Sequence, residues 1–175
     1  MPERSTPEMP PTLNAPREAV TLDSFADEFA VVCPRCSARA LVQAATTSRP
    51  PRLTCSKCGL SRLWTSTTKG VMTSRNARHW PKGQYALGDA ADPYFHLPLW
   101  LQVTCSAGVV WAFNERHLDY LLAYVAAESR CRPNRTPSGL RNALLESRLP
   151  RWMKLAKHRA EIVSAIRALQ TEQGR

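Results

Sequence analysis

The most regular pattern of apolar positions lies in the second half of the chain. Residues 97–104 and 109–113 are apolar and rich in aromatic and β-branched side chains, and the tripeptide Ser106-Ala107-Gly108 stands between them. Two such runs joined by a short turn that contains glycine are typical of paired antiparallel strands. The pattern therefore predicts a β-hairpin.

Helical periodicity follows the hairpin. Asn114 is a favourable N-cap residue, and after it apolar residues recur at i, i+3, i+4 and i+7, the spacing of one helical face: Leu118, Leu121, Leu122 and Val125. A second helix is predicted from Ser138 to about Arg148. A third is predicted to begin at Pro150, because proline is well tolerated in the first turn. Its expected buried face consists of Trp152, Leu155, Ala156, Ile162, Val163, Ile166 and Leu169.

The first half of the chain is less periodic. Residues 1–24 contain five prolines and scattered polar side chains, so residues 1–28 are predicted to be a disordered tail, with a short helical turn around 22–29. Partial alternation of apolar and polar residues at 38–44 and 62–67 predicts short strands. Residues 67–93 carry three glycines and two prolines without a clear period, which predicts a basic linker or loop.

Four cysteines in this first half form two pairs with the same spacing. The pairs are Cys33-Pro-Arg-Cys36 and Cys55-Ser-Lys-Cys58, and eighteen residues separate them. Two such knuckles can point four sulfurs at one centre, and a gap of this length is typical of zinc sites. We therefore predict that Cys33, Cys36, Cys55 and Cys58 bind one Zn²⁺ ion and fold residues 29–66 into a zinc ribbon. Gly59 suits the left-handed backbone that closes such a knuckle.

A shell of four thiolates leaves no position for water or substrate, so the predicted role of the metal is structural. Few apolar residues lie between the knuckles, and zinc binding in such modules supplies folding free energy on the order of 10 kcal/mol. Four core thiols or two disulfides are the alternatives, and neither pair has the βαβ surroundings of a redox motif. The predicted fold class is α+β, with the ribbon followed by a hairpin and about three helices at 94–175.

Charge is distributed unevenly along the chain, whose net charge is +10. Residues 1–30 have a net charge of −4, residues 31–82 carry ten basic and no acidic side chains, and residues 83–175 have a net charge of +4. An uncompensated basic segment favours contact with nucleic acid. The predicted contacts are Arg35, Arg39, Arg52, Lys57, Arg62, Arg75, Arg78 and Lys82. A protein-interaction adaptor without nucleic-acid contact is the alternative.

Other polar and aromatic residues are weaker candidates. His79 and Trp80 stand among basic residues and suit either base stacking or packing. The basic run 151–159 suits either a phosphate-binding surface or a solvated one. Cys105, His96, His117 and Cys131 lack ligand spacing and are expected to be a buried thiol and ordinary surface residues rather than a second metal site. Asp92, His96 and His117 form no recognisable catalytic arrangement, so no enzymatic activity is expected.

The expected compartment is the cytoplasm. No run approaches the roughly 20 apolar residues that cross a bilayer, and the N-terminus lacks the apolar region of a secretory signal. Six cysteines are then expected to be metal ligands and free thiols rather than disulfides.

Three segments, 92–102, 111–117 and 149–157, contain Asp92-Pro-Tyr-Phe-His-Leu-Pro-Leu-Trp, Trp111-Ala-Phe-Asn-Glu-Arg-His and Leu149-Pro-Arg-Trp-Met-Lys-Leu-Ala-Lys. With the knuckles, they resemble a group of uncharacterised bacterial zinc-ribbon-containing proteins. The resemblance implies a bacterial protein with a ribbon followed by a small domain, and it implies no activity. It also implies a second cysteine beside Cys105, where this chain has Ser106.

Overall fold

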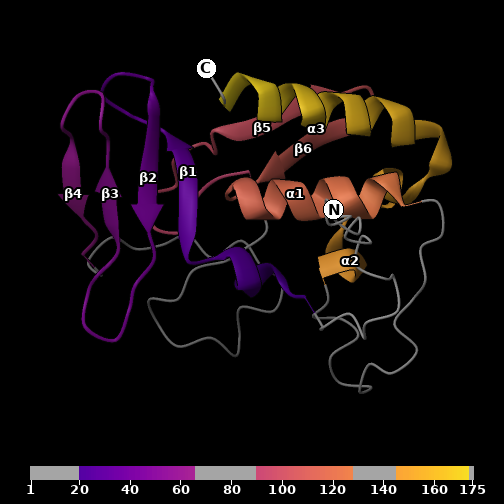
Figure 1. Ribbon diagram of the computed structural model, residues 1–175. Coiled ribbons are helices and arrows are strands. Elements are labelled where there is room, and N and C mark those ends of the chain that lie inside the picture. The colour runs from indigo at the N-terminus through magenta and orange to yellow at the C-terminus, as the bar shows by residue number, and fades with distance from the viewer. Residues whose placement is uncertain (1–19, 66–89, 128–144, 174–175) are drawn as a thin grey trace, which may run out of the picture.

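A computed structural model describes residues 20–65, 90–127 and 145–173 of the 175-residue chain. The fold is α+β, as the sequence predicts, with a four-stranded antiparallel sheet, a two-stranded sheet and helices (Figure 1). The elements in chain order are η1 (Leu22–Phe25), β1 (Glu28–Val32), β2 (Arg39–Gln43), β3 (Arg52–Thr54), β4 (Ser61–Leu63), β5 (Leu101–Cys105), β6 (Gly108–Ala112), α1 (Glu115–Ala126), α2 (Leu145–Arg148), η3 (Arg151–Lys154), η4 (Ala156–His158) and α3 (Arg159–Gln173).

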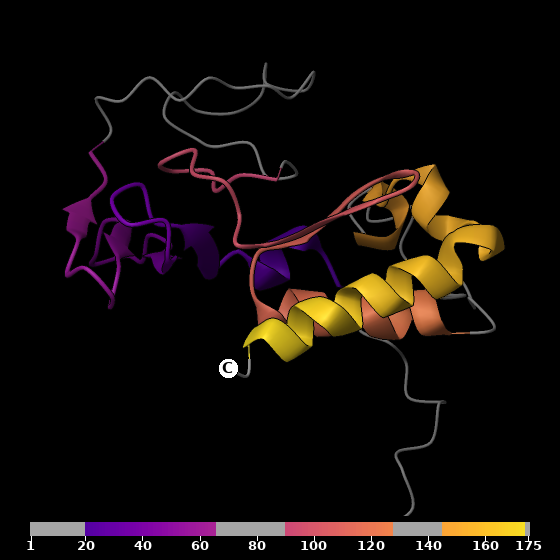
Figure 2. The same ribbon diagram turned by 90° about the horizontal axis from the view of Figure 1, so that it is seen from above.

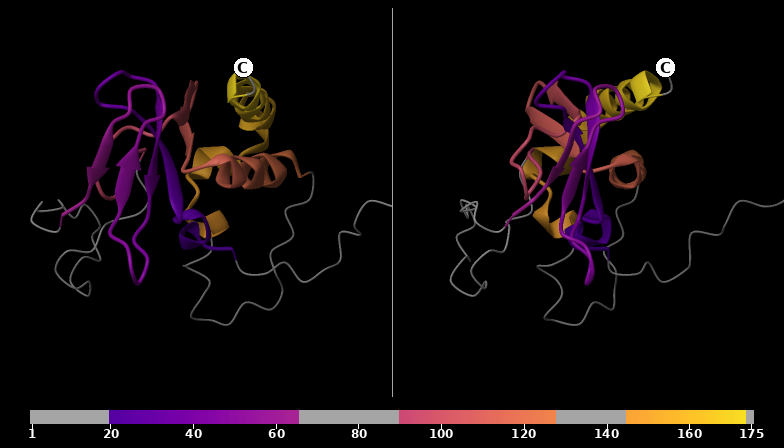
Figure 3. Two further views of the ribbon diagram at one scale, coloured as in Figure 1. Left: turned by 60° about the vertical axis from the view of Figure 1, so that its left-hand side comes forward. Right: turned by 90° about the vertical axis from the view of Figure 1, so that its left-hand side faces the viewer.

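Strands β1 to β4 form a meander in which each strand pairs with the next (Figure 3). Phe29, Val42 and Leu53 are cross-strand partners and lie buried on one face, because alternate residues of a strand point to the same side. The two cysteine knuckles connect β1 to β2 and β3 to β4. In a meander these two connections fall at the same end of the sheet, which brings the knuckles together.

Strand β1 is buried on both faces and covered along its outer edge. Its Ala30 N–H donates to the Phe113 carbonyl at 2.7 Å, and the Val32 N–H donates to the Pro98 carbonyl at 2.9 Å. The Trp100 N–H in turn donates to the Ala30 carbonyl at 2.9 Å. These bonds satisfy backbone groups that would otherwise be exposed at a sheet edge, and they attach the ribbon directly to the second half of the chain.

Two apolar clusters share β1 between them. Core 1 lies on the inner face of the ribbon and also contains Leu99, Phe113 and Leu145 from later in the chain. Core 2 lies between the β5–β6 hairpin and helices α1 and α3, which cover one face of the hairpin (Figure 2). The buried members of core 2 are Ala30, Leu101, Cys105, Val110, Ala112, Leu118, Leu121, Val125, Met153, Ile162, Ile166 and Leu169.

The predicted hairpin and the helix after Asn114 are both present. The first hairpin strand begins at Leu101 rather than at 97, because residues 98–100 leave the hairpin to cover β1. Residues 20–28, assigned to the tail by composition, include the turn η1, whose Leu22 and Phe25 are buried in core 1. Of the predicted helix 138–148, only Leu145–Arg148 lies within the described residues.

The prediction that the third helix begins at Pro150 is wrong. Two short 3₁₀ turns, η3 and η4, come first, and the helix α3 begins at Arg159. The backbone is extended at Leu155, whose side chain is exposed rather than buried. This break lets Trp152 lie against Gly108 at the hairpin tip, so closely that a Cβ atom on residue 108 would come within 2.9 Å of the indole.

Candidate metal centre

The two knuckles have the same backbone hydrogen bonds. In the first, the Cys33 N–H donates to the Ala38 carbonyl at 2.8 Å, and the Ser37 N–H donates to the Cys33 carbonyl at 2.9 Å. In the second, the Cys55 N–H donates to the Leu60 carbonyl at 2.8 Å, and the Gly59 N–H donates to the Cys55 carbonyl at 3.0 Å. The identical spacing in the sequence thus produces two equivalent turns.

Each knuckle closes through a left-handed residue directly after its second cysteine. The backbone φ angle is +69° at Gly59 and +56° at Ser37. Glycine adopts this conformation without strain, whereas a side chain makes it less favourable. The sequence predicts the role of Gly59. It gives no direct indication of Ser37, which is found only by aligning the two knuckles.

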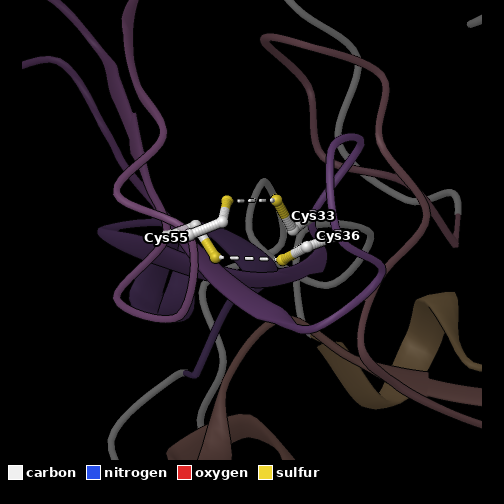
Figure 4. Close-up of side chains that lie close together, drawn as sticks. Cys33, Cys36 and Cys55 are labelled. Carbon is white, nitrogen blue, oxygen red and sulfur yellow. Dashed lines mark hydrogen bonds between the residues drawn. The ribbon is translucent and has the colours of Figure 1, made fainter.

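The four sulfurs converge between the knuckles (Figure 4). The Sγ atoms of Cys33 and Cys58 are 3.7 Å apart, as are those of Cys36 and Cys55, and all four lie within 4.8 Å of one another. A tetrahedral shell with metal–sulfur bonds of about 2.3 Å, the length typical of zinc, places its sulfurs about 3.8 Å apart. A disulfide requires about 2.0 Å. The four cysteines are therefore arranged to hold a metal ion and are not paired as disulfides.

Neighbouring groups shift the pKa values of the two thiols of the first knuckle in opposite directions. Burial raises the pKa of Cys33, but hydrogen bonds from the backbone N–H groups of Arg35 and Cys36 outweigh it and lower the pKa to about 6. At Cys36 a hydrogen bond from the backbone of Ala38 lowers the pKa, but burial and the neighbouring sulfurs raise it to about 12. Four adjacent thiols cannot all ionise alone, whereas a divalent cation at their centre would stabilise all four thiolates.

The other predicted site residues that the structure describes lie on the ribbon surface. Arg35, Arg52, Lys57 and Arg62 are exposed, and within the described residues none of them forms an ion pair. Arg39 differs, because its guanidinium pairs with Glu115 at the start of α1. The remaining three candidates, Arg75, Arg78 and Lys82, lie outside the described residues, as do His79, Trp80 and Cys131.

Three of the exposed cations, Arg52, Lys57 and Arg62, lie on β4 or next to it in the chain or the sheet. Arg52 pairs in register with Leu63, and Arg62 pairs with Leu53. These rows are adjacent, so the two arginines point to opposite faces of the sheet. Lys57 occupies the knuckle that leads into β4, and Arg49 is exposed in the β2–β3 connection. In the sequence, only its position in the acid-free segment 31–82 indicates that Arg49 adds to this positive charge.

Asp92 has a buried carboxylate whose two oxygens accept hydrogen bonds from backbone N–H groups. Its Oδ1 accepts hydrogen bonds from the N–H groups of Tyr94 at 2.9 Å and Phe95 at 2.7 Å, and its Oδ2 accepts one from Leu97 at 2.7 Å. Burial nevertheless raises the pKa of Asp92 above its usual value. The arrangement fixes the loop that precedes residues 98–100, the segment that covers β1, and in this loop His96 has a left-handed backbone.

The expectation that His117 is a surface residue is wrong, because its side chain is only 1% exposed. The ring stacks on Phe25 at 4.9 Å, and its Nδ1 accepts a hydrogen bond from the Phe113 N–H at 3.2 Å. Nε2 has no partner among the described residues. Burial lowers the pKa of His117 to about 4. The histidine therefore belongs to the junction between η1, β6 and α1.

Cys105 is a buried free thiol of core 2, and burial raises its pKa. Within the described residues, the four knuckle cysteines form the one group of three or more Cys, His, Asp or Glu side chains close enough to hold a metal ion. Neither Cys105 nor His117 belongs to that group.

No helix in the described ranges is both long and apolar enough to cross a membrane. Comparison of the chain with known protein families, with curated proteins and with solved structures gives no match.

Proposed function

We propose that the four cysteines bind one structural zinc ion and that the ribbon it holds in place contacts the phosphate backbone of nucleic acid. The metal has no catalytic part, because a shell of four thiolates offers no position to a substrate. The 3.7 Å separations between sulfurs of opposite knuckles support zinc. The protein acts as a binding module rather than an enzyme.

The exposed cations of the ribbon, which form no ion pair with any described residue, carry the proposal. Five of them lie among residues 31–65, where no acidic residue is present: Arg35, Arg49, Arg52, Lys57 and Arg62. Coordination by four thiolates adds a charge of about −2 at the knuckles, which these five cations exceed. Because Arg52 and Arg62 lie on opposite faces of the β3–β4 pair, the contact surface follows the β4 edge rather than one flat face.

Salt dependence of binding tests the proposal. Each phosphate neutralised on duplex DNA contributes about −0.9 to the slope of log K against log salt, so five contacts give a slope of about −4.5. The triple variant Arg52→Gln, Lys57→Gln, Arg62→Gln should make that slope shallower by about 3. Arg116→Gln is the matched control, because Arg116 is an exposed arginine that pairs with Asp27 outside the ribbon. An unchanged slope in the triple variant would refute this contact surface.

A protein-binding role is the second candidate, and one observation favours it. Leu63 is 50% exposed on the edge strand β4, all three residues of which are exposed. Open strand edges pair readily with extended segments of other proteins. A partner that remains bound to the ribbon after nuclease treatment, and is lost in Leu63→Glu but not in the arginine variants, would support this role over the first.

A further inference from the structure

A second group of cations lies at the turns that precede α3. Residues 147–160 contain no acidic side chain. In this segment η3, η4 and the first residue of α3 carry Arg151, Lys154, Lys157, His158 and Arg159. The two 3₁₀ turns, rather than one continuous helix, therefore display this charge.

Contacts with the hairpin hold these turns in place. Trp152 lies on Gly108, and Met153 is buried in core 2. Glu161, the third residue of α3, accepts hydrogen bonds from both the backbone N–H and the hydroxyl of Ser106, at 2.6 and 2.7 Å. Contacts from η3 and from the first turn of α3 thus hold the cation-bearing segment against the rest of the protein.

The acidic side chains around the turns are already engaged, and Glu161 also lies 3.9 Å from the His158 ring, one of the turns' own cations. Glu161 is bound by Ser106, whose two hydrogen bonds lower its pKa, and Glu146 accepts a hydrogen bond from the Tyr120 hydroxyl at 3.1 Å. Within the described part of the chain, Arg151, Lys157 and Arg159 form no ion pair. The Nε of Arg159 is shielded from solvent and has no hydrogen-bond partner there. The exposed charges of Arg151 and Lys157 are therefore available to a ligand.

The turns and the ribbon lie at opposite ends of the molecule. The four strands occupy one end in Figures 1 and 2, and the chain enters α3 at the other. Helices α1 and α3 and the hairpin lie between the two ends. A single small anion could not contact both surfaces.

We infer that the η3–η4 turns form a second phosphate-contacting surface, so that one long nucleic acid is bound at two separate places. The inference rests on the proposed function of the ribbon. An anionic membrane is a poorer fit, because interfacial segments bury an apolar face in the lipid. Here Trp152 and Met153 are turned toward the protein, and Leu155 alone is an exposed large apolar residue of the turns.

Two linked surfaces predict a dependence on ligand length. A folded chain of 175 residues is roughly 40 Å across, whereas a duplex of about 8 base pairs is roughly 27 Å long. A duplex of about 30 base pairs can contact both ends, and its second contact becomes intramolecular. The long duplex should bind more tightly than its larger number of overlapping sites explains.

The test compares the turn variant Arg151→Gln, Lys157→Gln with the ribbon triple variant and the Arg116→Gln control. Both substituted residues of the turn variant are exposed, and thermal unfolding checks that each protein folds. We expect the turn variant to bind the long duplex at least about tenfold more weakly at low salt, with a salt slope smaller by about 2. Its affinity for the short duplex should change much less.

Three outcomes would overturn the inference. In the first, the ribbon variant weakens binding to the long duplex and the turn variant does not, which leaves the proposed function intact. In the second, the turn variant loses binding to vesicles of phosphatidylserine and phosphatidylcholine while duplex binding is unchanged. In the third, wild-type protein binds neither duplex at low salt, which refutes the proposed function as well. Weakening by the turn variant alone would refute the ribbon surface and, with it, binding at two places.

Discussion

The ribbon and the hairpin–helix half of the molecule are stabilised in different ways. Strands β3 and β4 have three residues each, and of their six side chains only Leu53 is buried. The hairpin and helices α1 and α3 instead enclose core 2, with fully buried residues such as Leu101, Ile162 and Ile166. The outer strands of the ribbon have too little apolar surface to fold by burial alone, so we propose that a metal ion held by both knuckles stabilises them in place of a core.

The two halves nevertheless meet at β1. Cys33 and Cys55 are buried members of core 1, together with Phe113 from the end of the hairpin. Asn114 strengthens the junction, since its side-chain amide donates to the carbonyls of Phe25 and Glu28 at 2.9 Å each. Damage to the metal site should therefore reach core 1 before it reaches core 2.

The largest expected effect is that of metal removal. Chelation, or Cys55→Ser, should remove folding free energy on the order of 10 kcal/mol from the ribbon. We expect hydrogen exchange of β2 to β4 to become fast while α1 and α3 keep most of their protection. Equal loss of protection in α1 and α3 would contradict the separation of the two halves.

A cavity in core 2 should lower the free energy of unfolding without weakening metal binding by the ribbon. Ile162 is completely buried in α3, and Ile162→Ala should cost about 2–5 kcal/mol in the free energy of unfolding. The metal content of the Ile162→Ala variant should not change. The matched ribbon variant Leu53→Ala should weaken metal retention in competition with a chelator, and the comparison fails if Ile162→Ala weakens retention equally.

The His117 junction gives a pH dependence of intermediate size. Because the folded-state pKa of about 4 lies below the ordinary value of 6.5, the fold favours the neutral ring. Its contribution is present above pH 6.5 and is lost as pH falls toward 4, by about 3 kcal/mol in total. Denaturant unfolding of wild type and His117→Phe at pH 7 and 4.5 measures it. The stability difference between the two proteins should shift in favour of His117→Phe at pH 4.5, and a constant difference would rule out this contribution.

The smallest expected effect is on stability, from substitutions at the left-handed residue that closes each knuckle. Ser37→Gly should stabilise the protein by up to about 1 kcal/mol, because glycine relieves the left-handed strain at that position. Gly59→Ala should cost about 1 kcal/mol or more, although nothing lies within 4 Å of the added Cβ, since the φ angle remains +69°. Thermal unfolding of the metal-loaded proteins measures both, and effects of the same sign would contradict the equivalence of the turns.

Local sequence signals account for the features that the sequence predicts correctly. The CxxC spacing sets the knuckle turns, and Asn114 caps α1 through a bond from the His117 N–H to its side-chain oxygen. The tripeptide 106–108 supplies the hairpin turn. Each of these depends on residues within a few positions of one another, where periodicity and turn chemistry are informative.

The features that the sequence did not predict depend on distant contacts. The helix fails to begin at Pro150 because Trp152 packs on Gly108, 44 positions earlier. Arg39 is removed from the candidate contacts by Glu115 of α1. His117 is buried because Phe25 and the hairpin close over it. No pattern within a short window could reveal which of these polar residues would find such neighbours.

Metal analysis of the purified full-length protein tests the central claim most directly. Elemental analysis combined with protein quantification should give one zinc ion per chain, and Cys55→Ser should contain much less. A protein that contains no zinc, is folded through β1 to β4 and has four free knuckle thiols would contradict the account.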